Sequence, residues 1–351
     1  DTPVRTQRGD IVPQLILQDQ LAAPLEQLHD EIELENYPHN ARGHAGHCAT
    51  TLSRLRADSI RELLNAAGQQ RFAEKKRKFA RWISQRGAAQ AFYEGWMEAL
   101  GYKANKTPFR MLAQRLPLSE AVELREQLPA VLFGLANFLP TQAASGLARR
   151  LWQVWWQVRP QYEDRQLPPH AWRLHGVRPA NHPQRRLGLA VTLLQRYPQL
   201  LDNMVGAVQS HGNPEKLFLE LYEPFWSTHY TLGGRQQRRP IALLGPSRVR
   251  ELVANVVLPF IAAHAELSGD AGLCAKAATQ FATLPAAPGN SLMRLAAQQL
   301  FGTSKATGLV KTSLQQQGLL QIFQDFCLQD KSACQRCLFP ELVLRWTRSN
   351  G

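Results

Sequence analysis

Three cysteines near the C-terminus are the residues of this 351-residue chain whose spacing indicates chemistry most directly. Cys327, Cys334 and Cys337 lie within eleven residues, and only two residues separate the last pair. Thiolates at this separation can bind one soft metal ion from a single tight turn, as in zinc and iron–sulfur sites. The sequence therefore predicts a metal site, with zinc as the first interpretation and an iron–sulfur cluster as the alternative. In the other interpretation the cysteines stay reduced and pack as small apolar groups.

A fourth ligand must come from another part of the chain, because structural zinc sites are four-coordinate. Cys48 is the obvious donor, since it lies in a loop over residues 36–50 that is rich in Gly and His. His44 and His47 are reserve ligands. Four protein ligands leave no position for a substrate, so the predicted role is structural, and the metal would tie the two ends of the chain together.

The cysteine spacing also resembles the first three ligands of the iron–sulfur loop in endonuclease-III-type glycosylases. Val343 stands where that loop needs its fourth cysteine, and the glycine-rich hairpin with its catalytic Lys and Asp is not visible. A glycosylase is therefore not expected. Paired carboxylates, a Ser/His/Asp arrangement, a phosphate-binding Gly loop and a zinc-protease helix do not stand out either. His229 lies among aromatic residues and is expected in the core, so the sequence indicates no reaction.

The net charge of +13 at pH 7 favours a polyanionic partner, here DNA or RNA. Residues 61–118 carry twelve basic and four acidic side chains. Within them, Lys75, Lys76 and Lys78 are predicted to contact nucleic acid from the polar face of a helix. An alternative is that the positive charge only keeps the protein soluble.

A second basic segment combines three arginines with a predicted helix start. Arg178, Arg185 and Arg186 lie where a loop enters a helix, and a helix N-terminus favours anions. We therefore predict nucleic-acid contacts here as well; in the other interpretation the loop only caps the helix. The tryptophans of residues 151–159 could form a stacking platform for bases beside Arg149 and Arg150, or pack in a helical core.

Apolar spacing predicts a mainly α fold of two helical lobes with a small N-terminal β remnant. The strand is expected at Ile11–Leu17. Helical stripes follow, and the clearest of them runs from Val249 to Phe260 and is kinked or ended by Pro259. The proline-rich residues 159–183 are the expected boundary. The predicted parts are an N-terminal remnant over 1–50, a basic lobe over 51–158, the connection over 159–183 and a C-terminal lobe over 184–351.

Nothing in the sequence indicates a membrane or a secreted protein. The chain has five cysteines, no apolar run of membrane-spanning length and no signal peptide at its first residues, which suggests a reducing cytoplasm. It begins at Asp1 without a Met, so we expect either a processed N-terminus or a fragment.

Several motifs in one order resemble the bacterial family known as domain of unknown function 2851. The resemblance runs from about residue 10 to 340 and rests on the segments Phe92-Tyr93-Glu94-Gly95, Glu98-Ala99-Leu100-Gly101-Tyr102-Lys103-x-Asn105, Leu112-Ala113-x-Arg115-Leu116-Pro117-Leu118, Arg178-Pro179-Ala180-Asn181-x-Pro183-x-Arg185-Arg186-Leu187, Asn255-Val256-Val257-Leu258-Pro259-Phe260, Gln316-Gln317-Gly318-Leu319-Leu320 and the terminal cysteines.

This resemblance implies no activity, because none is established for the family. It implies that full-length relatives begin with a segment carrying Gly-Pro-Asp-Phe and, later, Val-Glu-Ile-His, an acidic pair similar to half of a restriction-endonuclease-like metal site. The resemblance therefore implies that this chain starts after that segment. We therefore expect a nucleic-acid-binding protein, the accessory helical part of a nuclease-like protein. The alternative is a helical scaffold for protein partners with no role in nucleic-acid binding.

Overall fold

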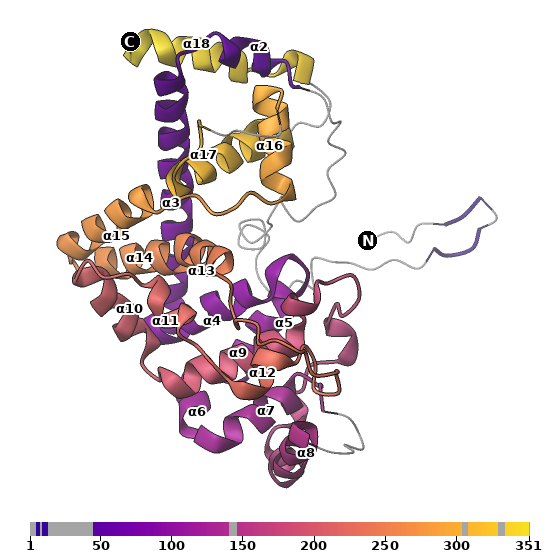
Figure 1. The fold of residues 1–351 in the computed structure, drawn as a ribbon. Coiled ribbons are helices and arrows are strands. Elements are labelled where there is room, and N and C mark those ends of the chain that lie inside the picture. Colours follow the sequence, from indigo (N-terminus) through magenta and orange to yellow (C-terminus); the bar gives the residue numbers. More distant parts are fainter. Residues whose placement is uncertain are drawn as a thin grey trace.

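The computed structural model describes residues 5–7, 9–12, 45–139, 146–303, 308–328 and 334–350. These residues confirm the mainly α fold (Figure 1). Within the described ranges the only β pairing consists of isolated antiparallel bridges, between Arg5 and Ile11 and between Pro285 and Thr312. Most of the strand predicted at Ile11–Leu17 lies outside the described residues, as does most of the predicted 1–50 remnant.

Helices make up most of the described residues. The α-helices are α2 (Cys48–Ser53), α3 (Ala57–Arg86), α4 (Ala88–Leu100), α5 (Tyr102–Arg115), α6 (Leu118–Glu123), α7 (Leu128–Leu135), α8 (Gly146–Val158), α9 (Pro183–Arg196), α10 (Leu200–Gln209), α11 (Glu215–Leu219), α12 (Pro224–Thr228), α13 (Pro246–Leu252), α14 (Leu258–Leu267), α15 (Ala271–Thr283), α16 (Ser291–Phe301), α17 (Ser313–Phe323) and α18 (Phe339–Asn350). Two π-helical segments, Val253–Val257 and Gln324–Leu328, follow α13 and α17. The short 3₁₀ helices are Arg125–Gln127, Arg159–Gln161, Glu163–Arg165, Pro169–Ala171, Pro179–Asn181 and Cys334–Arg336.

Helix α3 is the longest element among the described residues, and it runs from the group of α2, α16, α17 and α18 to the region of α4 and α14 (Figure 1). It contributes side chains to two hydrophobic clusters. The first part of α3 buries Ile60 and Leu64 in the smaller cluster. Its second part buries Phe72, Phe79 and Trp82 in the larger one. One rigid helix therefore joins the two clusters.

The clusters group the chain differently from the predicted parts. The smaller cluster combines residues of α2 and α3 with α16, α17 and α18, so segments from both ends of the described chain pack together. The larger cluster extends from Phe72 to Leu314. Tyr162, Leu167 and Trp172 belong to it, so the segment 159–183, expected to be a connection, contributes side chains to a core.

Helix α17 is buried along its whole length against α3. Glycines make this contact possible: a Cβ on Gly318 would lie 1.8 Å from the Leu64 carbonyl oxygen, and one on Gly68 would lie 2.2 Å from that of Leu314. The backbones therefore touch where side chains would normally separate two helices.

The predicted stripe from Val249 to Phe260 is buried. The sequence predicted that Pro259 either kinks or ends this helical stripe. Pro259 does not end the stripe, because α14 begins at Leu258 and continues through the proline. The preceding turn is π-helical over Val253–Val257. Proline has no amide hydrogen to donate, and a widened turn accommodates that loss within a continuous helical segment.

Candidate functional site

The four cysteines predicted as ligands come from three separate segments of the smaller cluster. Cys48 is the first residue of α2 and is buried. Cys327 lies in the π-helical segment after α17, and Cys334 begins the 3₁₀ helix that precedes Cys337. The amide of Cys337 donates to the Cys334 carbonyl at 3.4 Å, which closes a turn between these two residues.

The backbone before α2 holds the thiols near one another. The His47 amide donates to Cys334 Sγ at 3.1 Å across 287 positions of sequence. A Cβ on Gly46 would lie 3.4 Å from Cys334 Sγ and 3.5 Å from Cys48 Sγ. Gly46 itself is anchored, because its amide donates to the Gln299 carbonyl at 2.7 Å. The absence of a side chain at Gly46 allows its backbone to approach Gln299, because a Cβ would lie 2.8 Å from the Gln299 carbonyl oxygen.

Electrostatics show that all four thiols lie close enough to influence one another. The pKa of Cys48 is raised to about 12, mainly by burial and to a smaller extent by Cys334 and Cys337. The pKa of Cys327 is also raised to about 12, mainly by burial, with smaller contributions from Cys48, Cys337 and Cys334. In the part of the chain that the structure describes, no group of three or more Cys, His, Asp or Glu side chains is arranged so that it could hold a metal ion. The thiols therefore share one neighbourhood without forming a closed ligand shell.

Neither reserve histidine contributes a side chain to this group in the described residues. His44, one reserve ligand, lies outside the described residues, and His47 is exposed. Cys274 lies in α15, away from the four thiols, and packs partly buried against the larger cluster.

The lysines predicted on α3 all have partners within the protein. Lys75 donates to Asn255 and, at 2.7 Å, to Gln317 Oε1. Lys76 pairs with Glu266 at 2.7 Å. Lys78 pairs with Glu98 at 3.4 Å and lies 4.8 Å from the centre of the Trp82 ring. These cations join α3 to its neighbours, a role that their charge alone did not indicate.

The three arginines predicted to contact nucleic acid differ in how deeply they are buried. Arg178 is exposed, whereas Arg185 and Arg186 are only 1% and 3% exposed. The Arg185 guanidinium donates to the backbone carbonyls of five residues, namely Ala180, Trp226, Ile241, Ala242 and Leu243. Arg186 donates to the Leu243 carbonyl at 2.6 Å and to Asn181 Oδ1 at 2.8 Å. Both therefore hold the loop before α13 in place and do not form the exposed basic surface that the sequence suggested.

The tryptophans of α8 are also divided. Trp155 is buried, but Trp156 is 55% exposed and stacks on Trp152 with ring centres 5.4 Å apart and planes 12° apart. The Arg159 guanidinium lies 5.1 Å from the centre of the Trp156 ring. Arg149 and Arg150 are exposed on the same helix. Helix α8 thus places a stacked aromatic pair among cations at the surface.

A polar network that the sequence did not predict joins α3 to α17 and to both π-helical segments. Arg71 donates to Gln317 at 2.9 Å, Gln321 at 3.2 Å and Gln324 at 2.8 Å. Its only sequence signal is the run of glutamines in an otherwise apolar segment. Because the glutamines are buried and hydrogen-bonded, the network is explained by packing of α17.

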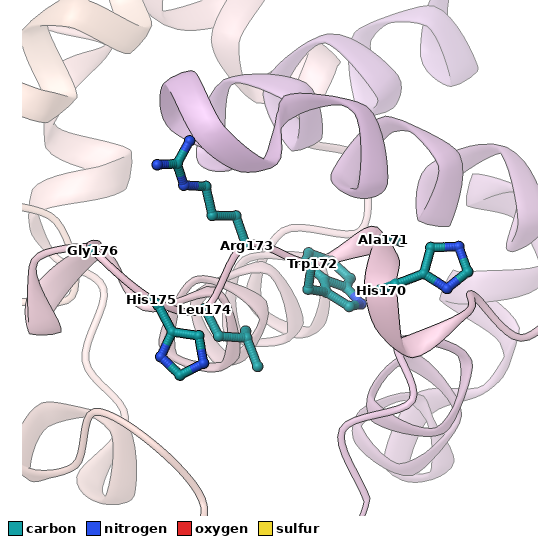
Figure 2. Close-up of a pocket in the computed structure, with 7 residues that line it drawn as sticks. All are labelled: His170, Ala171, Trp172, Arg173, Leu174, His175 and Gly176. Atoms are coloured by element: carbon teal, nitrogen blue, oxygen red, sulfur yellow. The ribbon is translucent and has the colours of Figure 1, made fainter.

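An open hollow on the surface is lined by residues 170–176. Figure 2 shows the His170 and His175 side chains at opposite ends of this segment, pointing away from each other. Two separated imidazoles do not form an acid–base pair. His229, expected in the core, is only partly buried; it stacks on Phe225 with ring centres 4.0 Å apart, and its Nδ1 lies 3.0 Å from the Phe225 carbonyl oxygen.

Across the described ranges, every helix is too short or too polar to cross a membrane. A family model with the description "Protein of unknown function (DUF2851)" matches residues 1–289. Neither a curated protein nor a solved structure matches the chain. The family match includes the segments around Tyr102, Arg185 and Asn255 and ends before the cysteine cluster. Since it spans most of the sequence, the chain belongs to the DUF2851 family, as its motifs predict.

Proposed function

We propose that this protein binds nucleic acid, and that unpaired bases stack on the Trp152–Trp156 pair of α8. The observation that carries the proposal is the 55% exposure of Trp156 within a stacked pair. A large aromatic ring is normally buried when its only role is packing. Base stacking on such rings is worth about 1–3 kcal/mol per base and requires no particular sequence.

The charge around α8 supports a polyanion as the ligand. Arg149 and Arg150 are exposed on α8, which contains no acidic side chain, and Arg159 lies 5.1 Å from the centre of the Trp156 ring while it also pairs with Glu163 at 3.0 Å. Phosphates of a strand stacked on the rings would lie among these guanidinium groups. Lys75, Lys76, Lys78, Arg185 and Arg186 have partners inside the protein, so the proposed interface rests on α8, and the exposed Arg178 remains a candidate for a further phosphate contact.

Fluorescence anisotropy with labelled DNA and RNA tests the proposal. Wild-type protein should bind single strands more tightly than duplexes at low salt, with affinity that falls steeply as salt rises. Trp156→Ala should weaken binding about tenfold or more, from the loss of stacking. Tyr222→Ala is the matched control, because Tyr222 is an exposed aromatic residue at 63% outside α8. Absence of binding to every probe at low salt would refute the proposal.

We also propose that Cys48, Cys327, Cys334 and Cys337 hold one structural metal ion, zinc first and an iron–sulfur cluster as the alternative. The proximity of four soft thiol donors from the two ends of the described chain supports this. An amide hydrogen bond to sulfur, as His47 gives to Cys334, is also the type of contact that orients a metal-bound thiolate. Each cysteine would supply one thiolate.

Elemental analysis and an absorbance scan of freshly purified, reduced protein test the metal proposal. About one zinc per chain supports a zinc site, and visible absorbance with bound iron supports the cluster. Cys48→Ser should lower the metal content, whereas Cys274→Ser, outside the group, should not. Wild-type protein with far less than one metal per chain and no visible absorbance would contradict it.

A helical scaffold for protein partners is the second candidate function. It is favoured by the surface of α18 and the residue before it, where Leu338 and Leu342 are 64% and 45% exposed and stand one helical turn apart. Contacts through leucines would be insensitive to salt, unlike phosphate contacts. Salt dependence of any complex therefore separates the two functions.

A further inference from the structure

Three arginines surround Tyr102 in a region that the proposals above do not use. Tyr102 begins α5, Arg185 and Arg186 lie in the first turn of α9, and Arg248 lies in α13. The guanidinium carbon of Arg248 lies 4.1 Å from the centre of the Tyr102 ring, and that of Arg186 lies 5.0 Å from it. Two segments recognised as family motifs thus meet at one tyrosine.

Positive charge is in excess at this cluster. The pKa of Arg186 is lowered to about 10, mainly by burial; the nearby Arg185 and Arg248 act in the same direction, while Tyr102 opposes the shift. Among the described residues, the carboxylate that acts on Tyr102 is Glu251, which is paired with Arg248. Three guanidinium groups and one carboxylate leave two positive charges without a compensating anion. Such an excess is costly away from water.

One buried donor of the cluster also lacks an acceptor within the described residues. Arg186 uses its two terminal nitrogens on Leu243 and Asn181 and also interacts with the Tyr102 hydroxyl. The hydrogen of that hydroxyl has no acceptor at normal hydrogen-bonding geometry. Buried polar groups nearly always have partners, so a phenol hydrogen without an acceptor beside excess positive charge indicates an external acceptor.

The tyrosine is held in place independently of any ligand. Its φ of 51° lies in the left-handed region that non-glycine residues rarely adopt. Three residues later, Asn105 donates to the Arg173 carbonyl at 3.0 Å and accepts from the Arg173 amide at 2.8 Å. These two bonds fix the start of α5 against the segment 170–176, and the bonds of Arg186 to Leu243 and Asn181 hold its guanidinium, so both groups are positioned before a ligand binds.

We propose that Tyr102, Arg186 and Arg248 bind a phosphate group. A phosphate dianion matches the two uncompensated charges, and its oxygens accept from guanidinium and phenol donors at the same time. The ligand reaches the cluster from the side of Arg248, whose side chain is 37% exposed. The site needs neither α8 nor the cysteines, so it stands apart from the proposed function.

Thermal shift and calorimetric titration of the full chain test this site, at constant ionic strength with chloride as the reference salt. Inorganic phosphate should raise the melting temperature and bind with a measurable heat. Arg248→Gln and Tyr102→Phe should each weaken binding about tenfold, the loss of one hydrogen bond to a charged group. Glu251→Gln should strengthen binding, because Arg248 loses its competing carboxylate. Arg250→Gln is the control, since Arg250 lies on the same helix and pairs with Glu215.

A second set of probes identifies the source of the phosphate. A nucleoside monophosphate and single-stranded oligonucleotides with and without a 5′-phosphate are compared with inorganic phosphate. Tighter binding of the phosphorylated oligonucleotide would assign a strand end, and tighter binding of the mononucleotide a small molecule. Trp156→Ala should leave phosphate binding unchanged, so this proposal and the one for α8 can fail separately. No response of wild-type protein to phosphate, or an equal response of Arg248→Gln, overturns the site.

Discussion

At the scale of single residues, the glycines where α3 meets α17 set how closely these helices approach. A methyl group on Gly318 would lie 1.8 Å from the Leu64 carbonyl oxygen, which is backbone and cannot rotate away. Gly318→Ala must therefore push the two helices apart. We expect a loss of about 3 kcal/mol in the free energy of unfolding, the upper range for overpacking, measured by urea denaturation.

Gly206→Ala is the matched control for this prediction. Gly206 also lies inside a helix, α10, but nothing lies within 4 Å of the position of an added Cβ. The substitution should raise stability by about 0.4–1 kcal/mol, because alanine restricts the unfolded chain. Equal effects of the two substitutions would show that helix propensity, and not the contact between helices, governs Gly318.

Residue types were informative where chemistry depends on type and spacing. The cysteines could be identified as a group because thiols at Cys-x2-Cys separation have few other roles. The arginines could not be assigned from type alone. Arg185 donates to the carbonyls of residues 241–243, more than fifty positions away, and nothing local distinguishes it from an exposed arginine such as Arg178.

At the scale of elements, apolar spacing predicted helices well because it reflects contacts within a few turns. The stripe at Val249–Phe260 is such a case. Apolar spacing did not predict the π-helical turn before Pro259. It also did not predict that Tyr162, Leu167 and Trp172 enter the larger cluster from short 3₁₀ and irregular segments. The burial of these side chains depends on contacts with residues far away in the sequence, and local periodicity does not predict such contacts.

The segment 159–183 is fastened to α6 by an ion pair, which gives a pH-dependent prediction. Arg165 donates to both carboxylate oxygens of Glu120, at 2.9 and 3.0 Å. The hydrogen bonds from Arg165 hold the pKa of Glu120 below its usual value of 4.5, against the smaller effect of burial. A carboxyl group with a lowered pKa in the folded state stabilises above its unfolded pKa, and this contribution is lost as the pH falls through the folded pKa.

Glu120→Gln should therefore lower the melting temperature at neutral pH and reduce its decline below pH 4.5 relative to wild type. Glu163→Gln is the control. Glu163 and its partner Arg159 are 53% and 40% exposed, so this ion pair should contribute little to stability. Thermal unfolding followed by circular dichroism from neutral to acidic pH measures both. Parallel curves for wild type and Glu120→Gln would exclude the ion pair as a source of acid sensitivity.

At the scale of the whole molecule, two hydrophobic clusters share α3, but the segments that close the smaller cluster come from both ends of the described chain. Residues of α2 pack there with α16 and α18. Holding such distant segments together has a large entropic cost, and a cross-link between them offsets part of it. The proposed metal lies at this junction, since Cys48 belongs to α2 and Cys337 precedes α18.

Removing the metal should therefore loosen one cluster and leave the other intact. Hydrogen exchange with and without a chelator is the measurement, because it reports local opening along the chain. We expect faster exchange in α2, α16 and α18, and unchanged exchange in α4, α7 and α9, whose side chains belong to the larger cluster. Metal binding stabilises the helices that carry or contact the ligands, so the increase in exchange rate should not extend beyond α3 into the larger cluster.

A cysteine variant separates this effect from unspecific action of the chelator. Cys48→Ser should reproduce the fast exchange in α2 and α18 without chelator, whereas Cys274→Ser, whose thiol lies on α15, should behave as wild type. Uniformly faster exchange in both clusters would mean that the metal supports the global fold through α3. Identical exchange with and without chelator, for protein shown to contain the metal, would mean that packing alone closes the smaller cluster.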